Sequence, residues 1–109
     1  MAYDEGVAER CREYLADCVG ISEKKMFGGL AFMYRGNMLI GIVGEALMAR
    51  VGPGEYAAAL KRPFVREMDF TGRPMKGYVY VDLAGFETDA DLKRWISLCL
   101  SFNATLPAK

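Results

Sequence analysis

The chain has 109 residues, of which 52% are hydrophobic and 26% charged, and its acidic and basic residues balance to a formal net charge of zero. These values exclude a disordered or low-complexity chain, and the length favours one domain over two. We therefore expect a single domain over residues 1–109 that is large enough to bury a hydrophobic core.

The N-terminus carries no export signal. Acidic residues begin at Asp4, no apolar segment follows the first methionine, and no stretch is apolar enough to span a bilayer. Three cysteines, Cys11, Cys18 and Cys99, make an odd number, and the first two lie two helical turns apart, beyond disulfide reach. We interpret all three as free core thiols and expect a cytoplasmic protein without membrane attachment.

Residues 4–18 have the spacing of an amphipathic helix. Apolar side chains at i, i+4, i+7, i+8 and i+11 form one stripe, which consists of Val7, Cys11, Tyr14, Leu15 and Cys18. Asp4 is placed to cap the N-terminus of this helix, and Gly20 is placed to end it.

From Lys25 onward the apolar period shortens to two or gives way to continuous apolar runs, which indicates strands. Three strands are predicted, over residues 26–34, 38–43 and 46–51. The joints between them are so short that neighbouring strands must be antiparallel. Gly28-Gly29 suggests a bulge or bend in the first strand, and Gly41 suggests a close approach by another group in the second.

The middle strand is apolar on both faces. Strict alternation places Met38, Ile40 and Ile42 on one face and Leu39 and Val43 on the other. A strand of this kind needs cover on both sides. We expect helices to supply one cover and a second copy of the chain to supply the other, which predicts a homodimer.

A short helix and two further strands are predicted next. Pro53 suits the first turn of a helix that ends at about Lys61, because the residue before Pro63 is pushed out of the helical region. Strands follow over residues 64–70 and 77–83.

The final helix has the clearest start. Thr88 and Asp91 have the spacing of a capping box, and the apolar side chains that follow at helical spacing are Leu92, Trp95, Ile96, Cys99 and Phe102. The order is helix, three-stranded antiparallel meander, short helix, two strands, helix. This order predicts an α+β fold with the helices gathered on one face of the sheet.

The chain lacks the residues on which most catalytic and metal sites depend. It has no histidine, and its cysteines have no Cys-x-x-Cys spacing. We predict no catalytic residues, no metal and no cofactor, and expect that the protein is not an enzyme. Most of the seven methionines are predicted to lie in the core, with Met75 the one most exposed.

The turn between the last two strands carries the first candidate contact residues, Asp69, Thr71, Arg73 and Lys76. Loops hold binding residues more often than strands do. Backbone N–H groups and two cations close together can bind an anion. We predict that this turn contacts a partner or an anion. Solvated charges, or a salt bridge to Asp69, are the alternative interpretation.

Basic residues outnumber acidic ones between Lys24 and Lys76, whereas acidic residues dominate the chain before Lys24. This asymmetry can mark a basic face, or it can bring two parts of one molecule together. A second hypothesis is therefore direct nucleic-acid binding, with affinity that falls as salt rises. The candidate basic face consists of Lys24, Lys25, Lys61, Arg62 and Arg66. A third hypothesis, an enzyme acting on a small anion at the turn, lacks a nucleophile with its base.

Three segments carry a resemblance to a known family: Lys25-Met26-Phe27-Gly28-Gly29-Leu30, Gly36-Asn37-Met38, and the run from Met68 to Tyr78. On these segments the chain resembles the N-terminal domain of the TfoX (Sxy) regulators of bacterial competence, and the likeness covers nearly the whole chain. Full-length competence regulators carry a second, helical domain. Here we expect the N-terminal domain to stand alone.

The resemblance implies an α+β fold of the kind shared with type III secretion chaperones, often paired as a dimer. It also implies a role in transcription through a protein partner, the cyclic-AMP receptor protein, without known catalysis. Our first hypothesis is therefore a regulatory protein-protein interaction module.

Overall fold

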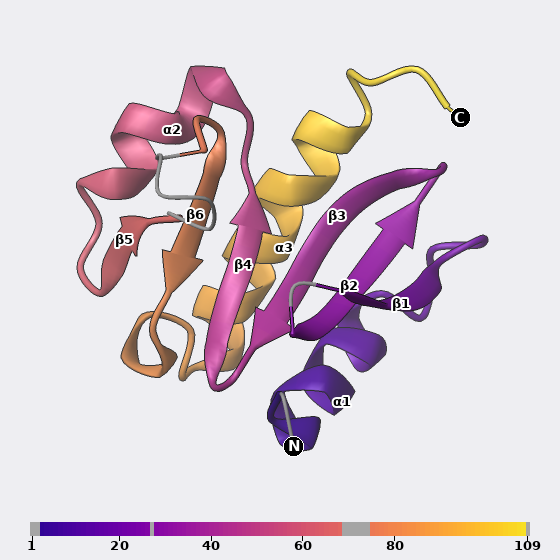
Figure 1. Ribbon diagram of the computed structural model, residues 1–109, viewed down its shortest axis with the longest axis horizontal. Coiled ribbons are helices and arrows are strands. Elements are labelled where there is room, and N and C mark those ends of the chain that lie inside the picture. The colour runs from indigo at the N-terminus through magenta and orange to yellow at the C-terminus, as the bar shows by residue number, and fades with distance from the viewer. Residues whose placement is uncertain (1–2, 27, 69–74, 109) are drawn as a thin grey trace.

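A computed structural model describes residues 3–26, 28–68 and 75–108 of the protein (Figure 1). Within these residues the chain forms one six-stranded antiparallel sheet, in the order β1-β2-β3-β4-β6-β5. The strands are β1 (Ser22–Met26), β2 (Gly29–Tyr34), β3 (Asn37–Val43), β4 (Ala46–Arg50), β5 (Val65–Glu67) and β6 (Tyr78–Val81). The helices are α1 (Glu5–Tyr14), α2 (Pro53–Leu60), the short 3-10 helix η1 (Leu83–Gly85) and α3 (Asp89–Asn103). The predicted α+β class is confirmed.

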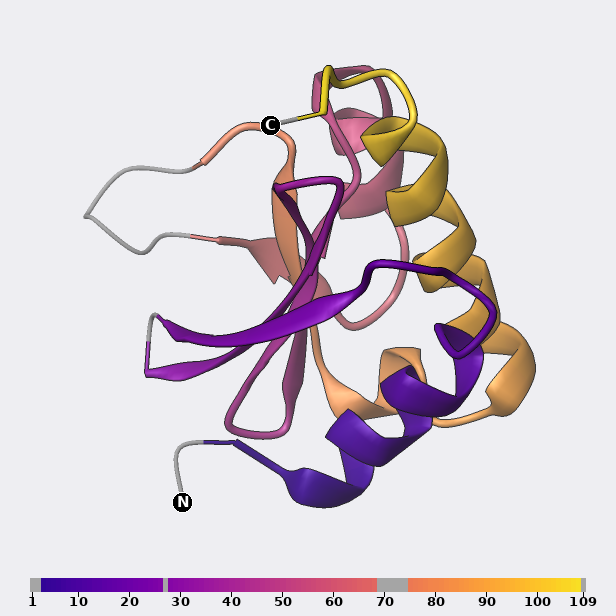
Figure 2. The same cartoon turned by 90° about the vertical axis from the view of Figure 1, so that its right-hand side faces the viewer.

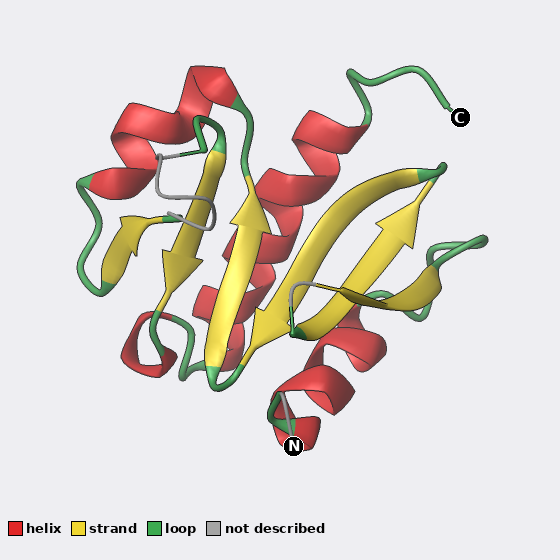
Figure 3. Cartoon of the chain, in the orientation of Figure 1, coloured by secondary structure: helices red, strands yellow, loops and turns green. Residues whose placement is uncertain are grey.

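The α-helices lie on one face of the sheet, as predicted (Figures 2 and 3). A row of fully buried side chains crosses the four central strands on this face, and its members are Phe32, Ile40, Ala49 and Val79. Leu92, Trp95 and Ile96 of α3 belong to the same core cluster. This core, beneath α3, is the rigid base on which the surface residues are held. Within the described residues, no helix combines the length and the apolar character needed to cross a membrane.

The predicted helix starts are confirmed by their caps. The Asp4 carboxylate accepts from the backbone N–H groups of Gly6 and Val7, at 2.8 and 3.2 Å, and the Thr88 hydroxyl accepts from Asp91 N–H at 3.1 Å. The predicted end of the first helix is wrong, because α1 ends at Tyr14. Cys18 therefore lies beyond the helix and is half-buried, although Cys11 and Cys99 are buried as expected.

The predicted strand over residues 26–34 is wrong, because it is two strands. Met26 of β1 lies opposite Gly29 of β2, so the chain reverses between them, and Gly28 has a φ of +72°. The sequence of β1 is charged and its residues from Ser22 to Lys25 are exposed. Lysines on an edge strand discourage pairing with another chain.

A bulge in β3 overturns the predicted alternation of the middle strand. Phe32 pairs with Ile40, but the next residue of β2, Met33, pairs with Met38, which leaves Leu39 without an opposite residue. Leu39 therefore joins Ile40 in the helix-side core, where it is 1% exposed. Met38 belongs to a different cluster on the other face. The face predicted for Met38, Ile40 and Ile42 together does not exist.

The face of the sheet away from the helices carries a second buried cluster, which we call the methionine layer. It consists of Ala31, Met38, Met48 and Met68, with Met26, Met33, Val43, Met75, Tyr78 and Tyr80 packed against it. The β1–β2 hairpin leans toward this side of the molecule (Figure 2). Gly41 leaves the room that Met48 fills, because a Cβ there would lie 2.6 Å from Met48 Cε. Met75 is half-buried, and none of the described methionines is exposed.

Both faces of β3 are thus covered within one chain, by the helices and by the methionine layer. A second copy of the chain is therefore not required to cover this face.

The predicted short helix is confirmed as α2, with Pro53 in its first turn. The two later strands are shorter than predicted, since β5 covers Val65–Glu67 and β6 covers Tyr78–Val81, and residues 69–70 of the first predicted strand lie outside the described residues. The predicted faces of β6 are confirmed. Val79 and Val81 point into the helix-side core, and the two tyrosines pack against the methionine layer.

Arg12 links α1 to β1 through ion pairs. Replacing it with glutamine is expected to lower the free energy of unfolding by a small amount that depends on pH. Its guanidinium donates to both carboxylate oxygens of Glu23 at 2.8 Å and also contacts Glu9. The hydrogen bonds from Arg12 lower the pKa of Glu23. Because that pKa is depressed on folding, the stabilisation is present above the ordinary glutamate pKa and is lost as the pH falls through the lowered value.

Urea unfolding of Arg12→Gln should therefore show a loss of less than about 1 kcal/mol at pH 7, since the pair is exposed to solvent. The difference from the native chain should shrink as the pH falls below about 4. Lys93→Gln removes an exposed cation from α3 and serves as the control. A deficit that stays constant down to pH 3 would contradict the role given to Glu23.

Candidate functional site

The turn residues predicted to contact a partner are placed only in part. Asp69, Thr71 and Arg73 lie outside the described residues. Lys76 is described, is exposed, and lies beside Arg50 and Tyr78 in a small surface pocket. The predicted turn therefore contributes one placed cation, and Arg50 joins it from β4.

The residues of the predicted basic face are not gathered on one surface. Lys24 and Lys25 lie on β1, at one edge of the sheet, whereas Arg66 lies on β5, at the opposite edge. Arg66 also forms hydrogen bonds with Asp82, the shortest at 2.9 Å, and these raise the pKa of the arginine. Its guanidinium carbon lies 4.9 Å from the centroid of the Tyr80 ring. The structure separates the cations that a nucleic-acid backbone would need together.

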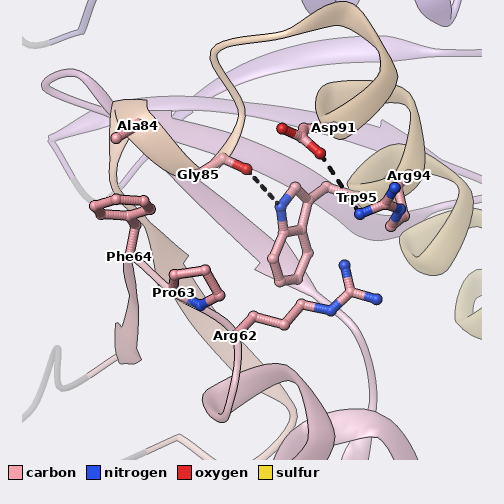
Figure 4. Close-up of a pocket in the computed structure, with 8 residues that line it drawn as sticks. All are labelled: Arg62, Pro63, Phe64, Ala84, Gly85, Asp91, Arg94 and Trp95. Carbon is pink, nitrogen blue, oxygen red and sulfur yellow. Dashed lines mark hydrogen bonds and ion pairs between the residues drawn. The ribbon is translucent and has the colours of Figure 1, made fainter.

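Arg62, by contrast, borders a groove of about 320 Å³ that we call the tryptophan groove (Figure 4). It is lined by Arg62, Pro63, Phe64, Ala84, Gly85, Asp91, Arg94 and Trp95. These residues come from the segment between α2 and β5, from η1, and from the first half of α3. Sequence-distant segments meet here, and Lys61 precedes the groove at the end of α2.

Trp95 is a fixed wall of the groove. It is 2% exposed and belongs to the helix-side core, while its indole N–H donates to the carbonyl oxygen of Gly85 at 3.2 Å. Gly85 itself packs closely against β6, since a Cβ there would lie 2.7 Å from Val81 Cγ1. The indole is therefore held in one orientation before any ligand arrives.

Phe64 forms the opposite side of the groove and is 55% exposed, the most exposed of the described aromatic side chains that line it (Figure 4). Its φ is +65°, in the left-handed region that a bulky residue rarely adopts. The neighbouring structure holds it there, because its carbonyl oxygen accepts from Asp82 N–H at 2.8 Å. Leu83, next to Ala84 of the groove, is also exposed. This combination of an exposed aromatic ring and a strained backbone makes Phe64 a candidate binding residue.

Positive charge surrounds the tryptophan end of the groove. The guanidinium carbon of Arg62 lies 5.3 Å from the centroid of the Trp95 ring, and Arg94 lies on the same side (Figure 4). Asp91 is the one carboxylate among the described lining residues, and it lies 3.5 Å from Arg94. Two cations and one anion leave the groove with a net positive charge that favours an acidic ligand.

The described residues that line the groove include no serine, threonine, cysteine, lysine or histidine. Burial raises the pKa of both the Cys11 and the Cys99 thiol to about 12, so neither is a thiolate at neutral pH. Within the described residues, no three histidine, cysteine or acidic side chains are grouped so that they could hold a metal ion. What the groove offers is an apolar slot with two arginines, which suits binding.

The helix-covered antiparallel sheet defines a small α+β domain with an aromatic groove on its surface. The chain belongs to the TfoX N-terminal domain family, whose model matches residues 13–103. The match runs from the last two residues of α1 to the end of α3, so the resemblance of the sequence motifs is confirmed. No curated protein and no solved structure gives a further match.

Sequence reasoning missed Phe64 as an exposed residue, and it placed Trp95 in the core without the groove that the indole lines. The strand predicted from Phe64 begins only at Val65, so Phe64 lies outside it, whereas the prediction that Trp95 lies in the core is confirmed. The available signal was Pro63, which stops α2 and leaves the next aromatic residue in a connection between elements.

Proposed function

We propose that the domain is a regulatory protein-protein interaction module and that its partner docks in the tryptophan groove. The observation that carries the proposal is Phe64, exposed and held in a left-handed backbone conformation beside a fixed tryptophan. Tryptophan, tyrosine and arginine are the residue types that contribute most to binding at protein interfaces, and phenylalanine is enriched there. A protein partner is favoured over nucleic acid because the cations are split between the two edges of the sheet.

The partner segment has a definable chemistry. An apolar side chain would fill the slot between Phe64 and Trp95, and an adjacent aspartate or glutamate would pair with Arg62 or Arg94. Arginine pairs with a carboxylate through two parallel hydrogen bonds, which fixes direction as well as charge. We propose that this acidic segment belongs to a transcription regulator, as the resemblance to competence regulators implies, and that the two proteins meet in the cytoplasm.

We also propose that the domain performs no chemistry of its own. The chain has no histidine, and the pKa of the two buried thiols is raised. These features support a protein that acts through contacts alone.

The homodimer stays a prediction. Its first argument, the apolar second face of β3, no longer supports it because the methionine layer covers that face. Sedimentation at micromolar concentration tests it directly.

Phe64→Gly is the variant that separates binding from folding. Glycine adopts a φ of +65° without the cost of about 1–2 kcal/mol that other residues bear, so the thermal midpoint should not fall. The probe is a displayed library of random peptides, selected on the native domain. We expect enriched peptides with an apolar residue beside an aspartate or glutamate, and we expect Phe64→Gly to weaken their binding by about tenfold or more.

The charge of the groove needs its own comparison. Arg62→Gln with Arg94→Gln should remove the preference for acidic peptides, whereas Lys24→Gln with Lys25→Gln removes the same charge from the far edge and should change nothing. No enrichment on the native domain, or enrichment that survives Phe64→Gly, would refute the docking site. A mobility shift of random duplex DNA at low salt, abolished by the Lys24 and Lys25 variant, would favour the nucleic-acid hypothesis instead.

A further inference from the structure

A second pocket, which we call the Arg50 pocket, lies where β4 passes into α2. It encloses about 90 Å³, and its described lining residues are Arg50, Gly52, Pro53, Lys76, Gly77, Tyr78 and Phe102. Phe102 lies two helical turns beyond Trp95 on α3, so this pocket is separate from the tryptophan groove. It goes beyond the interaction function proposed above.

The backbone holds the two sides of this pocket together. The N–H groups of Val51 and Gly52 both donate to the carbonyl oxygen of Gly77, at 2.9 and 3.0 Å. Gly52 has a φ of +88°, and a Cβ there would lie 2.2 Å from the ring of Phe102. Glycine is therefore required at this position, and it allows the ring and the backbone to close the pocket.

Arg50 is oriented by aromatic rings and not by a carboxylate. Its guanidinium carbon lies 5.3 Å from the centroid of the Tyr78 ring and 5.4 Å from that of Phe102. One ring comes from β6 and the other from α3. Among the described residues Arg50 has no acidic partner within salt-bridge distance. A guanidinium held by two rings is pre-organised for a planar pair of hydrogen bonds to an oxyanion.

Lys76 supplies a second cation from a different element, and the described lining contains no carboxylate. Glu55, the acid of the first turn of α2, lines another groove with Leu98 and Ser101. The start of α2 adds the partial positive charge of a helix N-terminus without a side-chain cap on Gly52. Cations from two elements converge on a space the size of one small oxyanion.

We propose that the Arg50 pocket binds a phosphoryl group, either as free phosphate or as the head of a small phosphomonoester. Arg50 provides the paired hydrogen bonds, and Lys76 neutralises the second negative charge. The pocket is too small for a nucleotide, so only the phosphoryl group enters it.

The test is a titration of the full chain with inorganic phosphate at constant ionic strength, followed by amide NMR shifts. We expect saturable shifts at Gly52, Gly54 and Gly77, and about tenfold weaker binding for Lys76→Gln and for Arg50→Gln, since a hydrogen bond to a charged group is lost. Lys76 is exposed, so its variant should fold normally. Lys61→Gln removes an equal charge from the other end of α2 and should bind as the native chain does.

A parallel titration with glycerol 3-phosphate identifies the source of the phosphoryl group. Tighter binding than phosphate assigns the pocket to a phosphomonoester, and equal binding assigns it to free phosphate. Amide shifts that never saturate would overturn the proposal. So would an affinity for phosphate that falls equally in Lys61→Gln and Lys76→Gln. Phe64→Gly should leave phosphate binding unchanged, so failure of this pocket and failure of the partner groove are distinguishable.

Discussion

Gly29→Ala should destabilise the fold by about 3 kcal/mol, the upper end of the cost of overpacking a core. Gly29 begins β2, and a Cβ there would lie 2.1 Å from the carbonyl oxygen of Ile42 and 3.1 Å from Val43 Cγ2. The oxygen belongs to the backbone of the central strand and cannot rotate away, so β2 and β3 would have to separate at Leu30 and Ile42. Urea unfolding of the variant and the native chain measures the difference.

Gly54→Ala is the matched control, because it makes the same chemical change where space is open. A Cβ at Gly54 would meet nothing within 4 Å, and the residue lies in the first turn of α2. Alanine there should raise stability by about 0.4–1 kcal/mol by reducing the freedom of the unfolded chain. Equal effects at the two positions would mean that the packing of β2 against β3 is not as described.

The elements that sequence patterns predicted well are those with local signals. Asp4 and Thr88 cap helices through contacts two or three residues away, and Pro53 fixes the start of α2 by its own ring. The α+β class followed from the change of apolar period after the first helix. None of these inferences required knowledge of the tertiary structure.

Two errors came from strands whose neighbours decide their pattern. β1 is exposed on an edge and carries the charged sequence Ser-Glu-Lys-Lys-Met, so it has no apolar alternation to detect. β3 is apolar at nearly every position, so its sequence gives no sign of the bulge at Leu39. A continuous apolar run predicts burial, but it does not predict which side chain faces which layer.

The candidate sites likewise depend on contacts between residues that are distant in the sequence. Residues close in sequence, such as Arg62 and Arg66, were predicted to act together with Lys24 because all are basic. The sheet order places Lys24 on one edge strand and Arg66 on the other, and this order follows from pairing between distant strands. The approach of Arg94 to Arg62, and of Arg50 to Lys76, likewise depends on where α3 and β6 pack. Composition alone does not encode these distances.

Met48→Ala should cost about 2–5 kcal/mol, the range found when a buried methionine is truncated and a cavity remains. Met48 is 1% exposed at the centre of the methionine layer, and its methyl group occupies the space left by Gly41. A domain of this size has a total stability of about 5–15 kcal/mol, so the loss would be a large fraction of it. Chemical denaturation at several protein concentrations is the measurement.

Met48→Leu is the control, because it keeps most of the volume and should cost less than about 1.5 kcal/mol. The concentration series decides what covers the methionine layer. If one chain buries this layer by itself, the midpoints of the native protein and of both variants are independent of concentration. If a second copy completes the layer, the midpoints rise with concentration, because association stabilises the folded state by mass action. A rise would restore the predicted homodimer and show that one chain does not cover the methionine layer by itself.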